Sequence, residues 1–486
     1  MMFRFKRTRL LKWFFKENND QMFTKEIYSN RRSKLAASTG SGILLFMGNE
    51  ESPMNFKDNA YHFRQDSTFL YYFGINEPHL TALIDLDENK TIVFGDEMSL
   101  DDIVWMGRQE TLAEKCASSG VEFLQGSTDL EIYLAKALAQ HRQIHFLPPY
   151  RGENKIRLAQ VLKIPVDQLA AEASVAFTKA VVAQRSIKSA EEIKELHQAA
   201  AISADIHLMV MKTAKPGQKE RDLVAAIQQA AVASGGQLAY PAILTTRGEI
   251  LHNHFYENTL QEGQLVLNDS GVETALGYAG DLTRTFPVSK KFTTEQKDVY
   301  DIVLEAYQQG VDMLSPDVRY LDVHLKACKT LALGLKDLGL MKGNIDDAVE
   351  QGAHAMFFQC GTGHMMGLDV HDMEDLGEAY VGYNDTLKKN TSQFGLKSLR
   401  LGKQLEAGHV LTVEPGLYFI PALMDQWGAT NKFSEYINYD KLQAFRDFTG
   451  IRVEDDFLIT STGHEMLGKT LALSTQEIEA IRAEAY

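Results

Sequence analysis

The sequence predicts a two-domain protein of the mixed α/β class, in the broad sense that includes α+β folds. With 486 residues the chain is too long for one ordinary hydrophobic core, so two domains are expected. Short apolar runs that end in turn residues alternate with runs of helical spacing in the first part of the chain. A change of pattern near Arg185 separates a first domain, residues 22–184, from a second, residues 185–486.

Composition is that of a globular protein and narrows the range of partners. Apolar residues make up 44% of the sequence and charged residues 24%, which are ordinary fractions. The net charge of −15 argues against nucleic acid as a partner. The three cysteines, Cys116, Cys328 and Cys360, are far apart and odd in number. They indicate neither a disulfide framework nor a zinc knuckle, and we expect a reducing, cytoplasmic location.

Residues 1–21 are predicted to be a basic extension that precedes the first domain. Their uncharged runs are too short for the core of a signal peptide, and Met22 offers an alternative start. A basic patch for a membrane surface is the other interpretation of this segment. No run of about 18 apolar residues occurs, so no transmembrane helix is expected and a membrane is not a predicted partner.

The first domain is expected to combine buried strands with helices. Apolar spacing predicts helices over residues 28–38 and 129–140. The aromatic stretch FRQDSTFLYYFGINEP, residues 63–78, is predicted to be a strand and turn in the core. Three apolar runs have the length and the flanking turns of buried strands: residues 42–48, 80–86 and 91–95.

In the second domain, capping boxes mark several helices. Ser189 with Glu192, and Thr293 with Gln296, each begin a run of helical spacing. Residues 380–405 are polar and rich in lysine, and we expect them to be a surface excursion. Further helices are predicted over 219–234 and 320–338, from 345 onward and after Ser474, and strands within 240–254, 409–419 and 450–460.

Asp269 and Asp281 lie in the stretch NDSGVETALGYAGDLTRTFP, residues 268–287. Apolar residues lead into Asp269, and Gly271, Gly277 and Gly280 punctuate the middle, as expected of a β-hairpin. Such a hairpin would set the two carboxylates side by side. Two like charges that close are unfavourable unless one is protonated or a cation lies between them.

Three further residues, His364, Glu414 and Glu454, complete a candidate cation site. Each lies on or beside an apolar stretch, where an acidic side chain needs a partner. Four carboxylates and one imidazole suit two divalent ions, Mn²⁺ first, with Co²⁺ and Zn²⁺ as alternatives. Two such ions can hold a bridging hydroxide and polarise a carbonyl, which is hydrolytic chemistry. Taken singly, each residue has a structural explanation as a turn, a strand end or an exposed histidine, so the prediction depends on the whole set.

These residues lie in motifs that resemble one enzyme family. In chain order the motifs are Asp-x-Gly at Asp269, then DLTRTFP, GHMMGLDVHD, TVEPGLYF and GIRVEDD. They resemble the pita-bread metallopeptidases, in particular the branch of Xaa-Pro aminopeptidase (aminopeptidase P) and prolidase. The N-terminal segments RQDSTFLYYFGINEP and DDIVWMGRQETL resemble the non-catalytic domain of that branch. The resemblance implies a creatinase-like, ribonuclease-H-like α/β domain followed by a pita-bread catalytic domain.

The resemblance also implies a role for each candidate ligand. Asp269 would bind one metal ion and Asp281 would bridge both. His364 and Glu414 would hold the other ion, and Glu454 would bridge as well. Glu414 would also carry the proton of the bridging water.

Other residues would act on the substrate. By the same resemblance, His371 would bind the substrate carbonyl, and Arg452 would orient the site or the substrate. His252 matches the upstream histidine of the family, with His254 as the alternative for that position.

The sequence departs from the family pattern in two places. Cys360 stands where the family has a histidine, four residues before the metal-binding one, and His354 is a poor substitute because it lies further upstream. This change concerns the proline side of the substrate pocket rather than metal binding. A tolerated small apolar side chain, a shifted activity and a redox-sensing thiol are the three interpretations. The spacing from Asp269 to Asp281 is one residue longer than expected, which a turn can absorb.

We therefore predict a dinuclear-metal exopeptidase that hydrolyses the N-terminal Xaa-Pro bond of peptides. Its expected partners are proline-containing peptides and further copies of the chain, as a dimer or tetramer. The alternatives are an Xaa-Pro dipeptidase (prolidase) and a pita-bread binding protein whose catalysis is weakened by Cys360. A creatinase-like hydrolase without metals would not need the carboxylates, and the large N-terminal domain disfavours a methionine aminopeptidase.

Overall fold

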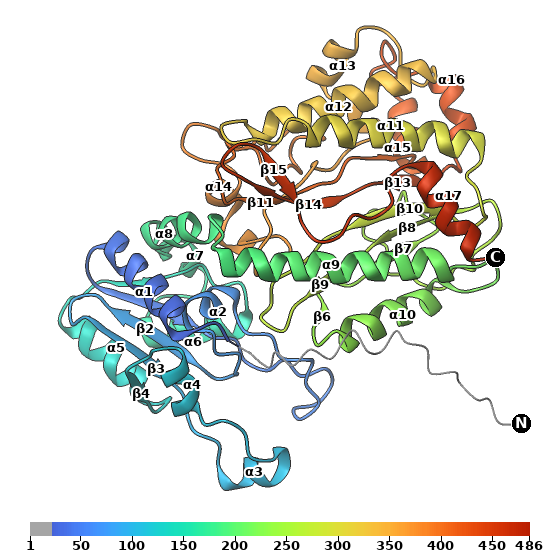
Figure 1. The fold of residues 1–486 in the computed structure, drawn as a ribbon. Helices are drawn as coiled ribbons and strands as arrows, with labels where there is room; N and C mark the ends of the chain where they lie inside the picture. Colours follow the sequence, from blue (N-terminus) through green and yellow to red (C-terminus); the bar gives the residue numbers. More distant parts are fainter. Residues whose placement is uncertain (1–21) are drawn as a thin grey trace, which may run out of the picture. The chain divides into compact units, whose positions relative to one another are not determined.

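A computed structural model describes residues 22–486, and the chain forms two compact units (Figure 1). The predicted basic extension, residues 1–21, lies outside the described residues. One unit runs to Ser186 and also contains Met373–Val381, while the other consists of Ile187–Asp372 and Gly382–Tyr486. Both units mix helices and strands. The sequence did not predict that Met373–Val381 would group with the N-terminal unit.

The N-terminal unit is built on a five-stranded sheet of order β4-β3-β2-β1-β5. Strand β1 pairs antiparallel with β2 and parallel with β5, and β3 pairs antiparallel with β2 and parallel with β4. The strands β1 to β3 lie within the three predicted apolar runs or one residue beyond them. Their bounds are β1 Ile43–Met47, β2 Thr81–Asp85, β3 Lys90–Phe94, β4 Phe123–Gln125 and β5 Ile144–Phe146.

Side chains of β1 alternate between two apolar layers, as the two-residue period of a strand requires. Ile43 and Leu45 belong to a core that includes residues of α5 (Asp129–Ala139) and α6 (Gly152–Leu162). Phe46 points the other way, and its ring centroid lies 5.2 Å from those of Phe73 and Phe177. Phe177 lies in α8 (Val175–Ser186), so helices cover both faces of the sheet.

The aromatic stretch predicted as a strand and turn contains a helix, α2 (Ser67–Phe73), and the prediction was wrong there. Asp66 caps the helix by accepting a hydrogen bond from the Phe69 N–H at 2.9 Å. Arg32 of α1 (Lys25–Thr39) donates to the Tyr72 carbonyl at the other end, at 2.8 Å. All seven residues of α2 are buried, so tertiary packing overrides the strand propensity of the aromatic residues.

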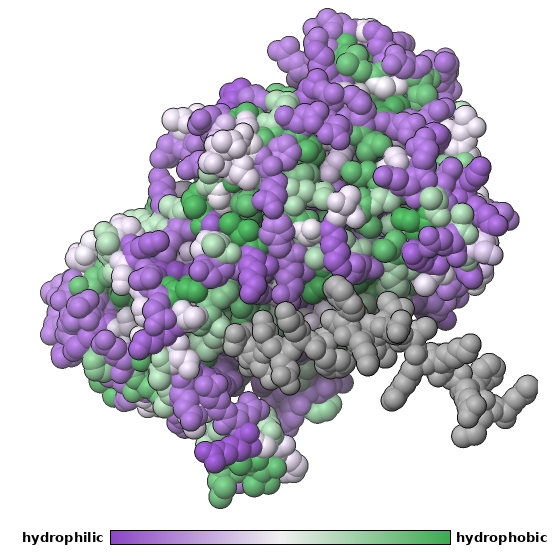
Figure 2. Space-filling view, in the orientation of Figure 1, coloured by the Kyte–Doolittle hydropathy of each residue, from purple (hydrophilic) through white to green (hydrophobic). Residues whose placement is uncertain are grey.

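Helix α3 (Leu100–Met106) is an exposed apolar element of the N-terminal unit. Trp105 is 86% exposed and Leu100 is 76% exposed. Figure 2 shows green side chains at the tip where Figure 1 places α3. An exposed cluster of this kind is typical of an interaction surface. The remaining helices of this unit are α4 (Leu112–Ser118), α7 (Leu169–Glu172), the 3₁₀ helix η3 (Glu374–Leu376) and α14 (Glu378–Val381).

The second unit has small sheets at its centre, of orders β10-β8-β7, β11-β14-β15, β12-β13 and β6-β9. An isolated bridge between Thr283 and Glu454 joins β10 to the segment between β13 and β14. The two halves of the unit therefore meet where the motifs DLTRTFP and GIRVEDD lie side by side. The strands are β6 Gln237–Leu238, β7 Ile243–Thr245, β8 Leu265–Asp269, β9 Val272–Glu273, β10 Thr283–Pro287, β11 Val410–Val413, β12 Gly416–Tyr418, β13 Gly450–Arg452, β14 Asp455–Ile459 and β15 His464–Met466.

Helices α9 (Ala190–Thr213) and α10 (Glu220–Ala233) lie on one side of these strands, and α11 (Thr294–Val311) and α12 (Tyr320–Asp337) lie on the other (Figure 1). Helices α9 and α11 begin with the capping boxes that the sequence predicts, and the last helix, α17 (Thr475–Glu484), begins with one formed by Ser474 and Glu477. Among the helices of residues 22–486, none has the length and apolar run needed to cross a membrane. The shorter helices are α13 Ile345–Gln351, η2 Ala353–Met356, α15 Pro421–Gly428, α16 Tyr439–Leu442 and η4 Gln443–Phe445.

Candidate metal centre

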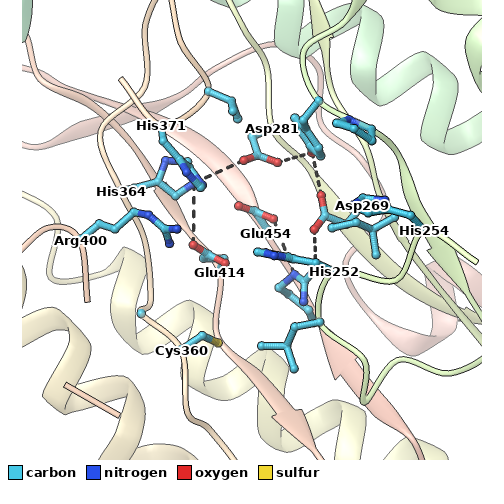
Figure 3. Close-up of a pocket in the computed structure, with 17 residues that line it drawn as sticks. His252, His254, Asp269, Asp281, Cys360, His364, His371, Arg400, Glu414 and Glu454 are labelled. Atoms are coloured by element: carbon cyan, nitrogen blue, oxygen red, sulfur yellow. Dashed lines mark hydrogen bonds and ion pairs between the residues drawn. The ribbon is translucent and has the colours of Figure 1, made fainter. Parts of the chain in front are cut away.

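A polar pocket of about 200 Å³ lies at the meeting of the strands of the second unit (Figure 3). All five predicted metal ligands line it, together with the predicted substrate residues His252, His371, Cys360 and Arg452. Arg400 and Tyr240, which the sequence did not predict, line it as well. The structure therefore brings together every site residue predicted from the sequence.

The predicted hairpin brings Asp269 and Asp281 together. Strands β8 and β10 pair antiparallel, with Asp269 opposite Thr283, and both aspartates are buried. The Tyr240 hydroxyl lies 2.7 Å from Asp269 Oδ1 and also contacts Asp281. Because a phenol carries one proton, it donates to one carboxylate, and the other must share a proton or a cation.

The residues between the aspartates do not make a simple turn. Strand β9 leaves the hairpin and pairs with β6. The two chain segments next to the aspartates then pass so close to each other that a Cβ atom on Gly271 would lie 1.7 Å from the Gly280 carbonyl oxygen. Glycine is therefore required at the crossing.

His364 presents one ring nitrogen to the carboxylates. Its Nδ1 donates to the Met365 carbonyl at 3.1 Å, which leaves the lone pair on Nε2. Nε2 lies 3.4 Å from Asp281 Oδ2 and 3.8 Å from Glu414 Oε1. Donor atoms of Asp281, His364 and Glu454 all lie within 4.8 Å of one another. This spacing and this tautomer are those of ligands around a common cation.

Glu454 and Arg452 are fixed from the hairpin side. The Thr283 hydroxyl donates to Glu454 Oε2 at 2.6 Å. Arg452 contacts Asp269 through Nη2, donates from Nε to Thr283 Oγ1 at 3.1 Å, and donates from Nη1 to the Tyr418 hydroxyl at 2.8 Å. Arg452 therefore holds Asp269 in place, and the guanidinium groups of Arg452 and Arg400 do not balance four carboxylates.

Burial, together with this excess of negative charge, raises the pKa values of several carboxyl groups. Burial, together with the charge of Asp269, raises the pKa of Asp281 to about 7. Burial raises the pKa of Glu414 to about 8, with Arg452 opposing and Asp281 assisting. The pKa of Glu454 also lies well above its usual value, through burial and then through Asp281. Divalent cations would relieve this repulsion, so the oxygen-rich donor set fits them.

Comparison with known proteins agrees with this geometry. Residues 194–461 match the family profile described as "Metallopeptidase family M24". The chain belongs to metallopeptidase family M24. Residues 28–145 of this M24 protein match the profile "Aminopeptidase P, N-terminal domain". Both matches confirm the family predicted from the motifs.

Individual relatives span almost the whole M24 chain. It is 32% identical to an Xaa-Pro aminopeptidase of Escherichia coli, over 95% of this chain and 98% of the relative. It is 30% identical to a human Xaa-Pro dipeptidase, over 93% and 90% respectively. The structure of proline aminopeptidase P II from Yersinia pestis superposes with a TM-score of 0.78 at 30% identity, covering 95% of this chain and 100% of that one. The predicted creatinase-like N-terminal domain and pita-bread domain are thereby confirmed, and the family implies divalent metal ions.

Two histidines of the M24 chain compete for the upstream position predicted for His252. Both His252 and His254 line the pocket and are exposed. Although its surface is partly open to solvent, the neighbouring protein partly desolvates His252 and lowers its pKa, and Asp269, Arg452 and His371 are near enough for their charges to act on it. His254 instead lies 3.4 Å from the Tyr256 hydroxyl through Nδ1. These contacts favour His252.

Cys360 lines the pocket as a neutral thiol. Its Sγ lies 4.0 Å from the Tyr418 hydroxyl, and burial, with the charge of Glu414, raises its pKa to about 12. A thiol of such high pKa is a poor nucleophile, which argues against the redox-sensing interpretation. His354 does not line the pocket and cannot supply the missing imidazole.

Arg400 corrects the expectation that residues 380–405 are a surface excursion. Leu399, Leu401 and Leu405 are fully buried. Arg400, which lies between the first two in the sequence, lines the pocket. A Cβ atom on Gly382 would lie 1.7 Å from the Arg400 carbonyl oxygen, so the segment packs closely upon itself. The Leu-Arg-Leu alternation was a visible signal, which the surrounding lysines obscured.

The loop that carries His371 is anchored by a buried ion pair that the sequence did not predict. Lys188 Nζ lies 2.9 Å from Asp372 Oδ2, and both side chains are 1% exposed. Because Asp372 follows His371 directly, the pair limits the movement of His371. The sequence carries no signal of this pair, because the burial of Lys188 is set by tertiary packing.

His207 of α9 fixes the backbone on both sides of Asp269. Its Nε2 donates to the Ser270 carbonyl at 3.0 Å, and its Nδ1 accepts from the Asn268 side chain at 3.1 Å. These are the contacts of a neutral imidazole. Burial lowers the pKa of His207 to about 4, so the ring remains neutral at physiological pH.

We expect a His207→Gln variant to change how stability depends on pH. An unfolded histidine has a pKa near 6.5, whereas folded His207 stays neutral to about pH 4. Between these values only the unfolded state gains the proton, so the wild type loses about 3 kcal/mol of unfolding free energy as the pH falls. Glutamine has no such loss. Denaturant titrations at pH 7 and pH 4 give the free energy of unfolding of both proteins. The difference in unfolding free energy between wild type and variant should change by this amount between the two pH values. An unchanged difference would contradict a neutral buried ring.

Proposed function

We propose that this chain is an Xaa-Pro aminopeptidase, which removes the N-terminal residue from peptides that have proline second. The observation that carries the proposal is the buried cluster of Asp269, Asp281, His364, Glu414 and Glu454 in one pocket. The names of its M24 relatives, Xaa-Pro aminopeptidase and Xaa-Pro dipeptidase, support the substrate class.

The proposed ligand assignment is the one that the family resemblance implies, and all five side chains line the pocket. By that assignment Asp281 and Glu454 would each contact both divalent ions, Asp269 would contact one of them, and His364 with Glu414 would contact the other. The oxygen-rich set suits Mn²⁺ best, with Co²⁺ and Zn²⁺ as alternatives. When bound, two such ions would supply Lewis acidity and a water of lowered pKa.

The side chains of the chain would do the remaining work. Glu414 would accept a proton from the attacking water at Oε1 and deliver it to the proline nitrogen as the peptide bond breaks. His371, whose ring centroid lies 4.4 Å from that of His364, would donate a hydrogen bond to the carbonyl oxygen of the scissile bond. Arg452 would keep Asp269 in position through their buried ion pair.

The proposal is tested by assaying the Mn²⁺-loaded protein on peptides of the form Xaa-Pro-Yaa. We expect release of the free Xaa residue, abolished by chelation and restored by Mn²⁺. An N-acetylated peptide serves as the control, because an exopeptidase of this kind needs the free amine. No turnover above the buffer blank, or equal turnover of the acetylated peptide, would contradict the proposal.

One observation favours a second candidate function, an Xaa-Pro dipeptidase. Arg400 lines the pocket and is near enough to Glu414 and His252 for its charge to act on both. A guanidinium at this place could hold the C-terminal carboxylate of a dipeptide in a bidentate pair. A longer peptide has an amide there and would gain less.

An Arg400→Met variant separates the two functions. If Arg400 binds a C-terminal carboxylate, kcat/KM for an Xaa-Pro dipeptide should fall on the order of 30-fold. The matched dipeptide amide lacks that carboxylate and should change by less than about threefold, and Arg400→Lys should retain part of the activity. Equal losses on the dipeptide and its amide would exclude carboxylate recognition by Arg400.

A further inference from the structure

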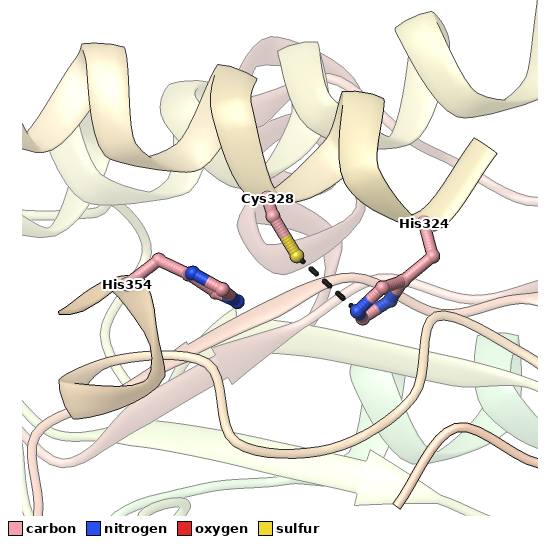
Figure 4. A group of neighbouring side chains, drawn as sticks. All are labelled: His324, Cys328 and His354. Carbon is pink, nitrogen blue, oxygen red and sulfur yellow. Dashed lines mark hydrogen bonds between the residues drawn. The ribbon is translucent and has the colours of Figure 1, made fainter. Parts of the chain in front are cut away.

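A second cluster of metal-binding side chains lies on the inner face of α12. His324 and Cys328 are one helical turn apart, and His354 approaches them from η2 (Figure 4). One donor atom from each residue lies within 4.8 Å of the others, and His324 Nε2 is 3.4 Å from Cys328 Sγ. The three side chains are buried, with exposed fractions of 0%, 0% and 2%.

His354 is the member of the cluster whose burial needs an explanation. Neither of its ring nitrogens has a hydrogen bond of ordinary geometry, although the Val349 carbonyl lies near enough to favour the charged ring. Figure 4 shows the ring pointing toward Cys328 and His324. An orphaned buried imidazole is rare and usually indicates an ion or a water. Burial also keeps His354 neutral, which is the form that binds metals.

His324 is oriented as metal-bound histidines are. Its Nδ1 lies 2.8 Å from the Thr362 hydroxyl oxygen. With Nδ1 protonated and donating to Thr362, the lone pair of Nε2 faces Cys328 and His354. The contact between Nε2 and the Cys328 thiol is the bond that a metal ion would replace.

This cluster differs from the peptidase pocket in place and in chemistry. None of the three residues lines that pocket. One soft sulfur donor and two borderline imidazole nitrogens make up this cluster, whereas the pocket is rich in hard carboxylate oxygens. Among the described residues, the cluster contains no carboxylate.

We propose that His324, Cys328 and His354 form a second metal site, which takes one thiophilic ion. As the ion binds, the Cys328 S–H bond breaks, its proton passes to solvent, and the sulfur coordinates as thiolate. Cu⁺ with one thiolate is electrically neutral, whereas Zn²⁺ would leave one positive charge in a buried region without a carboxylate. Charge balance and the three-donor set therefore favour Cu⁺. This inference does not depend on the proposed function.

The ion would join α12 to η2 and stiffen the segment that leads to the peptidase pocket. Thr362 contacts His324 and lies two residues before His364. The Tyr320 hydroxyl, one turn before His324, also contacts the Thr362 carbonyl, at 2.9 Å. The expected consequence of loading is a higher melting temperature rather than a new reaction.

The test measures metal content and metal ligands directly. Protein is produced in cultures supplemented with copper or zinc, loaded with Mn²⁺ and analysed by elemental mass spectrometry. We expect about one copper per chain in the wild type and at least a tenfold loss in Cys328→Ser and His354→Asn. Cys116→Ser, a buried thiol in the N-terminal unit, and Cys360→Ser, the pocket thiol, are the matched controls and should keep the ion.

X-ray absorption on the wild-type protein decides the outcome even if a variant fails to fold. A shell of one sulfur and two nitrogen atoms, with a melting temperature raised by about 5 °C, would support the site. Zinc with the same shell and the same variant pattern would also support it, and would correct the identity of the ion. A shell without sulfur, loss of the ion in Cys360→Ser alone, or no bound ion from either supplement would overturn the proposal.

Discussion

A Glu414→Gln variant is expected to turn over an Xaa-Pro-Yaa peptide about 1000-fold more slowly than the wild type, or worse. Glutamine keeps the size of the side chain but cannot accept a proton or neutralise a cation. Glu414 Oε1 lies 3.8 Å from His364 Nε2, in the pocket where burial raises the pKa of Glu414 to about 8. Steady-state kinetics at saturating Mn²⁺, with bound metal measured on the same samples, checks the prediction.

Glu406→Gln is the matched control for this variant. Glu406 lies on the same stretch of chain, is exposed, and undergoes the same change of charge. It should retain wild-type turnover within about twofold, as surface substitutions do. If Glu414→Gln keeps more than a tenth of the wild-type turnover, Glu414 is not the proton carrier.

The parts of the site that could be predicted from sequence are those with local signals. The hairpin of Asp269 and Asp281 is marked by apolar strands and by glycines within one short stretch. The helices α9, α11 and α17 are marked by capping boxes whose partners lie three residues apart. Such features depend on neighbours along the chain, so the sequence reveals them before the fold is known.

Other parts depend on contacts between distant segments. Arg400 reaches the pocket because its flanking leucines are buried and Gly382 lets the chain pack closely. Neither contact can be seen in the sequence, where the lysine-rich composition indicates an exposed segment. His354 meets Cys328 only because η2 folds back on α12. Helix α2 forms where aromatic residues favour a strand, because Asp66 and Arg32 cap its two ends. Tertiary packing determines these three features, and no local pattern in the sequence predicts them.

Replacing Arg284 with methionine is expected to destabilise the second unit by about 4 kcal/mol. Arg284 is fully buried on β10 and donates two hydrogen bonds to Asp455, each of 2.9 Å. It also donates to the carbonyls of Ala472 and Glu454, both at 2.8 Å. Methionine fills much of the space but leaves the Asp455 carboxylate without its cation. Calorimetry should show that the melting temperature of the variant is lower than that of the wild type by roughly 10 °C.

The control is Arg446→Met, which removes an equally well-formed but exposed pair. Arg446 donates to both oxygens of Asp425, at 2.7 and 2.6 Å, on the surface. Water solvates these charges in either state, so we expect almost no change in stability. Similar losses in Arg284→Met and Arg446→Met would mean that burial does not set the cost.

A double variant identifies the source of the Arg284 effect. In Arg284→Met, Asp455 keeps a bond from the Tyr307 hydroxyl, at 2.6 Å, but carries a buried charge that no cation balances. Adding Asp455→Asn removes that charge while leaving an oxygen to accept from Tyr307. If the uncompensated charge dominates, the double variant should be more stable than Arg284→Met and recover about half of the loss. If the lost hydrogen bonds to backbone carbonyls dominate, Asp455→Asn will lower the stability of the variant further. In that case the guanidinium stabilises the strand junction beside Glu454 as a hydrogen-bond donor rather than as a charge.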